Sequence, residues 1–353
     1  MKILVIKFRN IGDVLLTTPL IKNLKLNFPD AQIDVLINEG TEAVLKYNPA
    51  INKIYTYDRN KYKNFSLLKK LIKEYKFLKN FKNYDIIINT TEGDRGAFIA
   101  KFSNAKIKVG YPVKKNRILK YVFNFQMPKP SLLRHTIENN LDALRVLEKN
   151  VYEKRVYIYW NKEDEKKING LLPETEFVHI HPVSRWLFKC IKDEIVANII
   201  DFIKSKGYEV VITASPDKKE IQKVESILSF CKSNPVNLTG KLSLNQVAYL
   251  SSKARLFVGV DTAVMHIAAA VDTPVVAFFG PSGAFNWGPW DNDLTQSGYT
   301  KKNGIQEMGK HTVIQHDWDC VPCGKDGCDG SKISDCLMRF DMKKIYKLIG
   351  ERL

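Results

Sequence analysis

The chain alternates short apolar runs with longer segments in which apolar residues recur every three or four positions. Lys2–Phe8, Gln32–Asn38 and Asp85–Asn89 are almost continuous apolar runs, the pattern of strands that are buried on both faces. Ile11–Leu26 has helical spacing, and Pro19 is expected to kink or interrupt it because proline lacks an amide hydrogen. The other elements expected in this half are a helix at Leu67–Leu78, a last strand at Lys106–Tyr111 and a bridging helix at Leu133–Glu148.

The second half repeats this alternation with stronger signals. The apolar residues within Val196–Ile203 lie on one face of a helix, and Gly207 suits its C-terminal cap. Ser243 and Gln246 have the spacing of a capping box, which predicts a helix through about Ser251. The remaining expectations are strands at Glu176–Ile180, Glu209–Thr213, Leu256–Val260 and Pro274–Phe279, and helices at Ile221–Leu228 and Thr262–Val271.

Strand–helix alternation throughout the chain predicts an α/β fold with parallel sheets and right-handed crossovers. The 353 residues are enough for two Rossmann-like domains that face a cleft. We expect a first domain over residues 1–165 and a second over 166–341. Ligands of such sheets bind beyond the carboxyl ends of the strands, so candidate chemistry is sought in the loops that follow strands.

Two loops of the first half carry candidate residues. Gly12 and Asp13 lie where the first strand turns into a helix, so the carboxylate is either a general base or a simple helix cap. The loop after Asp85–Asn89 contains Glu92, Asp94 and Arg95, which either contact an acceptor or only turn the chain. The first loop lacks the G-x-G-x-x-G pattern, which disfavours a dinucleotide cofactor there.

Two loops of the second half are suited to an anion. After Glu176–Ile180 the chain offers the hydroxyl of Ser184 and the ammonium of Lys189, a point charge that fits a diphosphate. After Leu256–Val260, a helix begins near Thr262, and its first amide groups form an anion site. The residues singled out in this second loop are Asp261, Thr262, Ala263 and His266.

Two histidines and a cluster of cysteines are candidate metal ligands. His179 and His181 lie two apart on one strand, and without further ligands they are interpreted as structural. Six cysteines are present, and four of them cluster near the C-terminus. Their spacing lacks paired C-x-x-C knuckles, which leaves open a structural zinc, reduced thiols or disulfides. The clustered cysteines are Cys320, Cys323, Cys328 and Cys336.

The net charge of +17 indicates an anionic partner: nucleic acid, an acidic membrane surface or a phosphorylated substrate. Its lysines are scattered, so a lysine-rich proteome explains the charge equally well. Apolar runs stay below the roughly 18–20 residues that span a bilayer, and the N-terminal run is too short for a signal sequence. We therefore expect a cytoplasmic protein.

Beyond these patterns, the sequence resembles a known family. FRNIGDVLLTTP near the start and GVDTAVMHIAAAVDTPVVAFFGP later resemble glycosyltransferase family 9, the ADP-heptose:lipopolysaccharide heptosyltransferases. HPVSRWLFKC and FFGPSGAFNWGPW are most similar to the heptosyltransferase III branch. The resemblance implies a GT-B architecture, with the acceptor on the first domain and the ADP-sugar on the second. It also implies inverting transfer without a metal or other cofactor, and a C-terminal segment, 342–353, that packs back on the first domain.

The resemblance assigns roles to individual residues. Asp13 matches the catalytic aspartate, Lys189 the lysine that binds the diphosphate, and Asp261 the aspartate that binds heptose hydroxyls. Thr262 and Ala263 match the helix start that binds the diphosphate, and Ser184 lies near a position where relatives carry a hydroxyl. Two residues after Glu209–Thr213 compete for the acidic residue that binds the ribose: Asp217 and Glu220.

The function implied is transfer of L-glycero-D-manno-heptose from ADP-heptose to the inner core of lipopolysaccharide. Such an acceptor places the enzyme at the cytoplasmic face of the inner membrane, by weak peripheral contact. An alternative of the same fold uses another nucleotide sugar or another cell-surface acceptor. An alternative of a different class is a basic nucleic-acid-binding protein, but the aromatic residues are not interleaved with basic ones as in stacking platforms.

Overall fold

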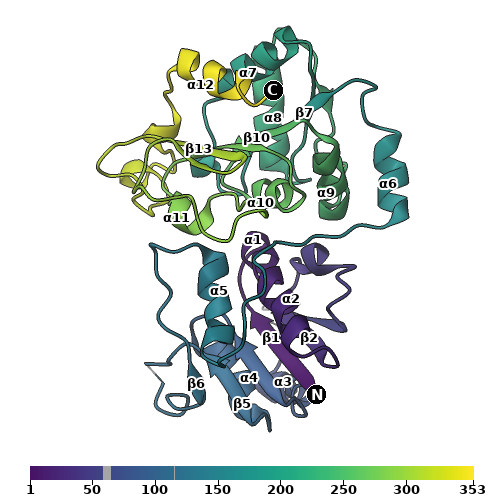
Figure 1. Ribbon diagram of the computed structural model, residues 1–353, viewed down its shortest axis with the longest axis vertical. Helices are drawn as coiled ribbons and strands as arrows, with labels where there is room; N and C mark the ends of the chain where they lie inside the picture. Colours follow the sequence, from purple (N-terminus) through teal and green to yellow (C-terminus); the bar gives the residue numbers. More distant parts are fainter. Residues whose placement is uncertain (59–64, 115) are drawn as a thin grey trace. The chain divides into compact units, whose positions relative to one another are not determined.

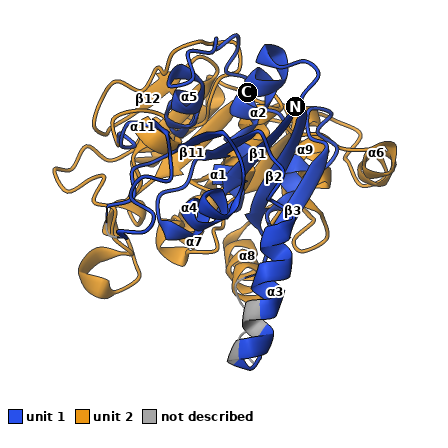
Figure 2. Cartoon of the chain, turned by 90° about the horizontal axis from the view of Figure 1, so that it is seen from below, with its two compact units in different colours: residues 1–131, 136–157 blue, residues 132–135, 158–353 orange. Residues whose placement is uncertain are grey.

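The computed structural model describes residues 1–58, 65–114 and 116–353 (Figure 1). The chain forms two compact units, distinguished by colour in Figure 2. Unit 1 comprises residues 1–131 and 136–157, and unit 2 comprises 132–135 and 158–353.

The boundary between the units differs from the expected one after residue 165. Tyr159 and Trp160 belong to unit 2 because Asn245 donates a hydrogen bond to the Tyr159 carbonyl at 2.7 Å and the Trp160 ring packs on Tyr249. The short segment 132–135 also joins unit 2, where the His135 ring lies 3.0 Å from the Gly288 carbonyl. These contacts join residues that are far apart in the chain, so local periodicity does not reveal them.

Unit 1 is built on a six-stranded parallel sheet in the order β3-β2-β1-β4-β5-β6. The central strands are buried on both faces, as their apolar runs predict. Two strands of the sheet, β3 and β6, escaped the sequence analysis because they are edge strands with mixed polarity. The strands are β1 (Lys2–Lys7), β2 (Gln32–Asn38), β3 (Lys53–Tyr57), β4 (Ile86–Asn89), β5 (Ile107–Gly110) and β6 (Phe125–Gln126).

Pro19 divides the first predicted helix of unit 1 into two. The chain leaves helical geometry after Leu15 and resumes it at Thr18, so that Pro19 falls in the first turn, where no amide hydrogen is needed. Asn23 then ties this region to the end of the unit by donating to the Glu153 carbonyl at 2.7 Å. The helices are α1 (Ile11–Leu15), α2 (Thr18–Asn27), a 3-10 turn (Glu42–Leu45), α3 (Leu67–Lys79), α4 (Asp94–Phe102) and α5 (Thr136–Arg145).

Unit 2 contains a seven-stranded sheet in the order β12-β13-β11-β10-β7-β8-β9. All neighbouring strands are parallel except β12 and β13, an antiparallel hairpin at one edge. The four central strands confirm the sequence prediction, whereas the hairpin and β9 were not anticipated. The strands are β7 (Phe177–His181), β8 (Glu209–Ile212), β9 (Val236–Asn237), β10 (Leu256–Val260), β11 (Val275–Phe279), β12 (Gln306–Met308) and β13 (His311–Gln315).

The helices of unit 2 begin and end where their caps predict. Ser243 accepts the Gln246 amide while the Gln246 side chain returns to the Ser243 amide, which confirms the capping box. Gly207 follows α7 with a φ of 88°, a left-handed conformation that suits glycine. The helices are α6 (Lys162–Asn169), α7 (Asp193–Ser205), α8 (Lys218–Phe230), α9 (Leu244–Lys253), α10 (Ala263–Ala270), α11 (Ala284–Trp287) and α12 (Met342–Gly350), with 3-10 turns at Leu187–Lys189, Cys328–Gly330 and Asp335–Leu337.

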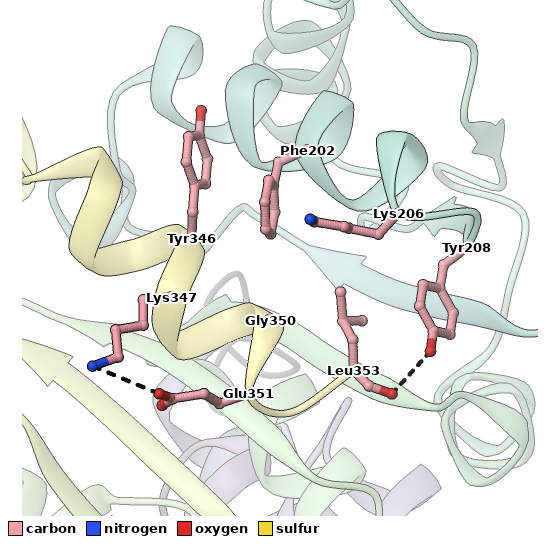
Figure 3. Close-up of a pocket in the computed structure, with 8 residues that line it drawn as sticks. All are labelled: Phe202, Lys206, Tyr208, Tyr346, Lys347, Gly350, Glu351 and Leu353. Atoms are coloured by element: carbon pink, nitrogen blue, oxygen red, sulfur yellow. Dashed lines mark hydrogen bonds and ion pairs between the residues drawn. The ribbon is translucent and has the colours of Figure 1, made fainter.

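The C-terminal helix α12 lies within unit 2, and the packing of residues 342–353 on the first domain that the resemblance implies stays a prediction. Ile345 and Ile349 are buried in the core that they share with α7. Tyr346 stacks on Phe202 of α7 with ring centroids 4.4 Å apart. Figure 3 shows the Tyr346 and Phe202 rings side by side, and the apolar side of α12 is covered by α7 within unit 2.

Candidate active site

Asp13 lies in the third position of α1, directly after the carboxyl end of the central strand β1. The Asn10 amide donates to its Oδ2 at 3.3 Å, so the carboxylate does cap the helix, as one interpretation predicted. Burial raises the pKa of Asp13, and the positive charges of Lys7 and Arg9 oppose that effect. A half-buried carboxylate with a raised pKa is a better proton acceptor than a solvated one, so the cap geometry is compatible with a general base.

Lys7 is a functional candidate that sequence reasoning missed. It ends β1, is buried, and donates to the Thr90 carbonyl at 3.1 Å and to Asn140 Oδ1 at 3.0 Å. Burial lowers its pKa to about 8, although the charge of Asp13 favours the ammonium. The available signal was a lysine that directly follows the apolar run Ile3–Ile6 of a buried strand, since a buried charge requires a partner.

The loop between β4 and α4 lies beside the end of β1, because the two strands are neighbours and the Phe8 amide donates to Thr91 Oγ1 at 3.0 Å. Arg95 lies over the rings of Phe8 and Tyr57, with its guanidinium carbon 5.3 Å and 4.9 Å from the two centroids. Glu92 is exposed in this loop, and Asp94 is exposed at the first position of α4. Unit 1 therefore collects a base candidate and an oriented guanidinium at adjacent strand ends.

Lys189 and Asp261 meet in unit 2 at the carboxyl ends of β7 and β10, which are adjacent strands. Lys189 Nζ lies 2.6 Å from Asp261 Oδ2. Burial opposes ionisation of Asp261, yet Lys189, with Ser282 and His266, holds its pKa below the ordinary value. The Lys189–Asp261 hydrogen bond is therefore a charge-assisted contact in a largely buried setting.

Helix α10 begins beside this ion pair. The Thr262 side chain caps the helix by accepting the Met265 amide at 3.3 Å, and Ala263 is its first residue. The helix start confirms the position expected from the sequence and provides amide groups suited to an anion. His266 is buried one turn later, and its Nδ1 finds no hydrogen-bond partner within the described residues. Burial lowers the pKa of His266 to about 4, so the ring is neutral at physiological pH.

Two serines complete this side of unit 2. Ser184 is buried in the loop after β7, and its Oγ accepts the Trp186 amide at 3.3 Å. Ser282, in the loop after β11, hydrogen-bonds the carboxylate of Asp261 and was missed by the sequence analysis. The sequence feature that could have indicated Ser282 is its position in another strand-end loop, two residues after Gly280.

Asp217 and Glu220 take different positions after β8. Asp217 is exposed and caps α8 by accepting the Lys219 amide at 2.9 Å. Glu220 is buried, and its Oε2 accepts the Ser215 amide at 3.0 Å. Each carboxylate thus has a local backbone partner, and Glu220 is the one that turns toward the strand-end loop after β8.

The structure places His179 and His181 in a buried hydrogen-bond network. Thr213 Oγ1 lies 2.7 Å from His179 Nε2 and 2.9 Å from His181 Nδ1, and Ser251 meets the other nitrogen of His179. Burial lowers the pKa of both rings, that of His181 to about 4. This arrangement confirms the structural interpretation of the pair.

The four clustered cysteines lie in irregular chain between β13 and α12. Cys336 is buried, Cys328 is half-buried, and Cys320 and Cys323 are exposed, all as free thiols. Within residues 1–58, 65–114 and 116–353, histidine, cysteine and carboxylate side chains form no group of three that could hold a metal ion. The structural zinc, the reduced thiols and the disulfides that the spacing left open each stay a prediction for this cluster.

A pocket of about 550 Å³ opens on unit 2 at the C-terminus, away from the strand-end loops just described (Figure 3). Its lining comes from α7, α12 and the chain end, where Tyr208 donates to the Leu353 carbonyl at 3.0 Å. The residues singled out from the sequence are absent from this lining. The candidate chemistry therefore resides in the two groups of strand-end loops, one in each unit.

Comparisons with known proteins give these groups a context. The family model for glycosyltransferase family 9 (heptosyltransferase) matches residues 74–316. The chain is 34% identical to lipopolysaccharide heptosyltransferase 3 of Escherichia coli over 290 residues. This aligned region covers 81% of this chain and 85% of that protein.

Two solved structures show the same fold. A family 9 glycosyltransferase from Veillonella parvula covers 99% of this chain and 96% of its own, with 20% identity and a TM-score of 0.78. The match to ADP-heptose lps heptosyltransferase II of E. coli covers 100% of this chain and 98% of that chain, with 18% identity and a TM-score of 0.75. The predicted α/β fold of the GT-B type is confirmed. On the family match and the 34% identity together, the chain belongs to glycosyltransferase family 9 and is a glycosyltransferase.

Proposed function

We propose that this enzyme transfers L-glycero-D-manno-heptose from ADP-heptose to the inner core of lipopolysaccharide, with inversion at the anomeric carbon. The observation that carries the proposal is the ion pair of Lys189 and Asp261 beside the start of α10. A cation, capped amide groups and a carboxylate within one group of loops suit a ligand that carries both a diphosphate and a polyhydroxylated sugar. The similarity to heptosyltransferase 3 supports heptose as that sugar.

On the acceptor side, Asp13 acts as the general base. Its carboxylate takes the proton of the acceptor hydroxyl while that oxygen forms a bond to the anomeric carbon. The bond from the anomeric carbon to the diphosphate oxygen breaks, and ADP leaves with its electron pair. The raised pKa of Asp13 suits this role because it increases the proton affinity of the carboxylate.

On the donor side, Lys189 stabilises the charge that develops on the departing diphosphate. The amide groups at Thr262 and Ala263 bind the same phosphates, with Ser184 adding a hydroxyl. Asp261 accepts hydrogen bonds from heptose hydroxyls, and Glu220 is our choice over Asp217 for the adenosine ribose. His266 is neutral, so it adds no positive charge and serves as a hydrogen-bonding group of the donor site. These cationic and amide groups supply the charge compensation in a transfer that needs no metal.

The acceptor is anionic, and the enzyme meets it at the cytoplasmic face of the inner membrane. Arg95 suits a phosphate or an acidic sugar of the core, while Gly12, Glu92 and Asp94 complete the acceptor group at the ends of β1 and β4. The net charge of +17 favours such a partner. In the part of the chain that the structure describes, every helix is too short or too polar to cross a membrane.

The test is to incubate the protein with ADP-heptose and heptose-deficient lipopolysaccharide, and to weigh the product by mass spectrometry. We expect a gain of one heptosyl residue, with GDP- and UDP-sugars inactive. Transfer from UDP-sugars alone would reject the donor assignment. Salt-sensitive DNA binding without affinity for any sugar nucleotide would favour the nucleic-acid alternative instead.

A further inference from the structure

Helix α3 of unit 1 carries two apolar faces: among its described side chains, one face packs into the core of the unit and the other is largely exposed. Phe77 packs edge-on against Phe81 at 5.0 Å and against Tyr57 at 5.5 Å, and Leu78 is buried in the same core. Glu74, the one acidic residue of the helix, also turns inward and accepts the Tyr57 hydroxyl at 3.0 Å. This inner face accounts for the attachment of α3 to the unit.

The second apolar face, which we call the outer stripe, consists of Leu68, Ile72 and Tyr75. Their spacing of four and three places them on one side of the helix, opposite Phe77. The side chains are 69%, 47% and 51% exposed. Exposed apolar residues are ordinary when scattered, but a contiguous row on a helix indicates an interaction surface.

The outer stripe continues onto α4. Phe102 meets Tyr75 edge-on at 5.8 Å, and Phe98, one turn earlier on α4, is 53% exposed. Phe65, just before α3, is exposed as well. Figure 2 shows that α3 extends beyond the rest of unit 1.

Lysines accompany the outer stripe along its length. Lys69, Lys73 and Lys76 are exposed beside it, and Lys79 Nζ lies 4.9 Å above the Tyr75 ring. Because Glu74 points inward, the solvent side of α3 carries positive charge alone. An apolar row flanked by lysines is the arrangement by which a helix lies in the interface of an anionic bilayer, with its aliphatic side chains among acyl chains and its ammonium groups at phosphates.

We propose that the outer stripe and its lysines dock unit 1 on an anionic phospholipid bilayer. The proposal rests on the proposed function, since it specifies how an enzyme with a membrane-embedded acceptor reaches it. A second copy of the chain is the poorer occupant, because pairing two outer stripes brings their lysines together and like charges repel. A bilayer rich in anionic lipid instead neutralises them.

The test is co-sedimentation of the full chain with sucrose-loaded vesicles of phosphatidylethanolamine and phosphatidylglycerol, and with phosphatidylcholine vesicles for comparison. Leu68→Asn with Ile72→Asn is the apolar variant, and both sites are exposed, so folding should persist. We expect its partition coefficient on anionic vesicles to fall about ten- to hundredfold. The matched control, Leu171→Asn with Phe230→Asn, changes two exposed apolar residues of unit 2 and should bind as the unaltered chain does.

The charge variant replaces Lys69, Lys73 and Lys76 by glutamate. We expect it to lose binding to anionic vesicles by at least about tenfold, because each lysine near the surface contributes roughly 1 kcal/mol. The control for total charge replaces three exposed lysines of unit 2 by glutamate, which lowers the net charge equally and should leave most binding intact. Those three control positions are Lys162, Lys166 and Lys218.

Three outcomes would overturn the proposal: no binding by the unaltered chain, equal loss in the α3 and control variants, or a dimer that dissociates when the outer stripe is changed. Heptosyl transfer to a water-soluble core oligosaccharide separates the two proposals. Docking variants should retain that transfer. If the unaltered chain binds vesicles but transfers nothing to either acceptor, the proposed function fails while the docking surface stands.

Discussion

Lys189 Nζ and Asp261 Oδ2 lie 2.6 Å apart although 72 residues separate them in the chain. Each residue follows one of two adjacent parallel strands, so the sheet brings their loops together. The pair is largely buried, with side chains 19% and 9% exposed. Removing one partner of such a buried pair destabilises the fold more than removing both, because the remaining charge is left without compensation.

Replacement of Lys189 by alanine should weaken ADP-heptose binding about ten- to hundredfold and also reduce turnover, because a charge-assisted contact to the diphosphate is lost. Calorimetric titration with ADP and ADP-heptose gives the affinities. Lys192→Ala is the matched control, since Lys192 lies three residues on and its side chain is 52% exposed. Unchanged affinity in the Lys189 variant would rule out its phosphate role.

Asp13→Ala should leave the dissociation constant for ADP-heptose nearly unchanged while transfer falls about 10²–10⁴-fold. The reason is that the donor-binding candidates belong to unit 2, whereas Asp13 belongs to unit 1. Steady-state kinetics and calorimetry measure the two quantities separately. Asp30→Ala, which removes an exposed carboxylate from the same unit, should behave as the unaltered enzyme does. Normal turnover in Asp13→Ala would reject this residue as the base.

Lys7→Met should move the acidic limb of the pH profile of kcat/KM to higher pH. The Lys7 ammonium lowers the pKa of Asp13 against the effect of burial. Without that charge the pKa of Asp13 rises, and the carboxylate form required of a base appears only at higher pH. A thermal melt controls for folding, because Thr90 and Asn140 lose a donor. An acidic limb that stays in place would show that Lys7 is only structural.

The fold should lose stability between pH 6.5 and pH 4. His181 is buried, and its pKa falls to about 4 in the folded state, so the unfolded chain binds the proton at higher pH. The neutral ring is favoured fully above pH 6.5, and this stability, about 3 kcal/mol for His181, disappears as the pH falls toward 4.

Urea unfolding at pH 7.5, 5.5 and 4.5 measures this loss. His181→Gln should flatten the dependence of the unfolding free energy on pH. His316→Gln should not, because that ring is partly exposed and stands outside the His179–Thr213–His181 network. Equal pH dependence in both variants would contradict the assignment.

Asp217 and Glu220 should separate into a structural and a ligand-binding residue. Asp217→Ala removes the cap of α8 and should cost about 1 kcal/mol of unfolding free energy, with ADP affinity retained. Glu220→Gln should weaken ADP binding several-fold, because the amide cannot accept as strongly from ribose hydroxyls. Affinity for ADP by titration and the midpoint of urea unfolding are the two readouts. The reverse pattern would exchange the two roles.

The sequence by itself determined which residues follow strands and begin helices. Apolar periodicity and caps are local properties, so the central strands, the capping box at Ser243 and the interruption at Pro19 could all be predicted. Since parallel strands present their carboxyl ends at one edge, Asp13, Lys189 and Asp261 could be singled out as candidate site residues, and the resemblance to family 9 supplied their expected roles.

Only the tertiary structure decided which of these side chains meet. Three such contacts depend on strand order and desolvation: the pairing of Lys189 with Asp261, the burial of Lys7 against Thr90 and Asn140, and the packing of α12 on α7. The edge strands were missed for a related reason, since their pairing is supplied by neighbours rather than by their own apolar pattern. Local patterns specify elements, whereas contact energies between distant residues specify the charge state and geometry of the site.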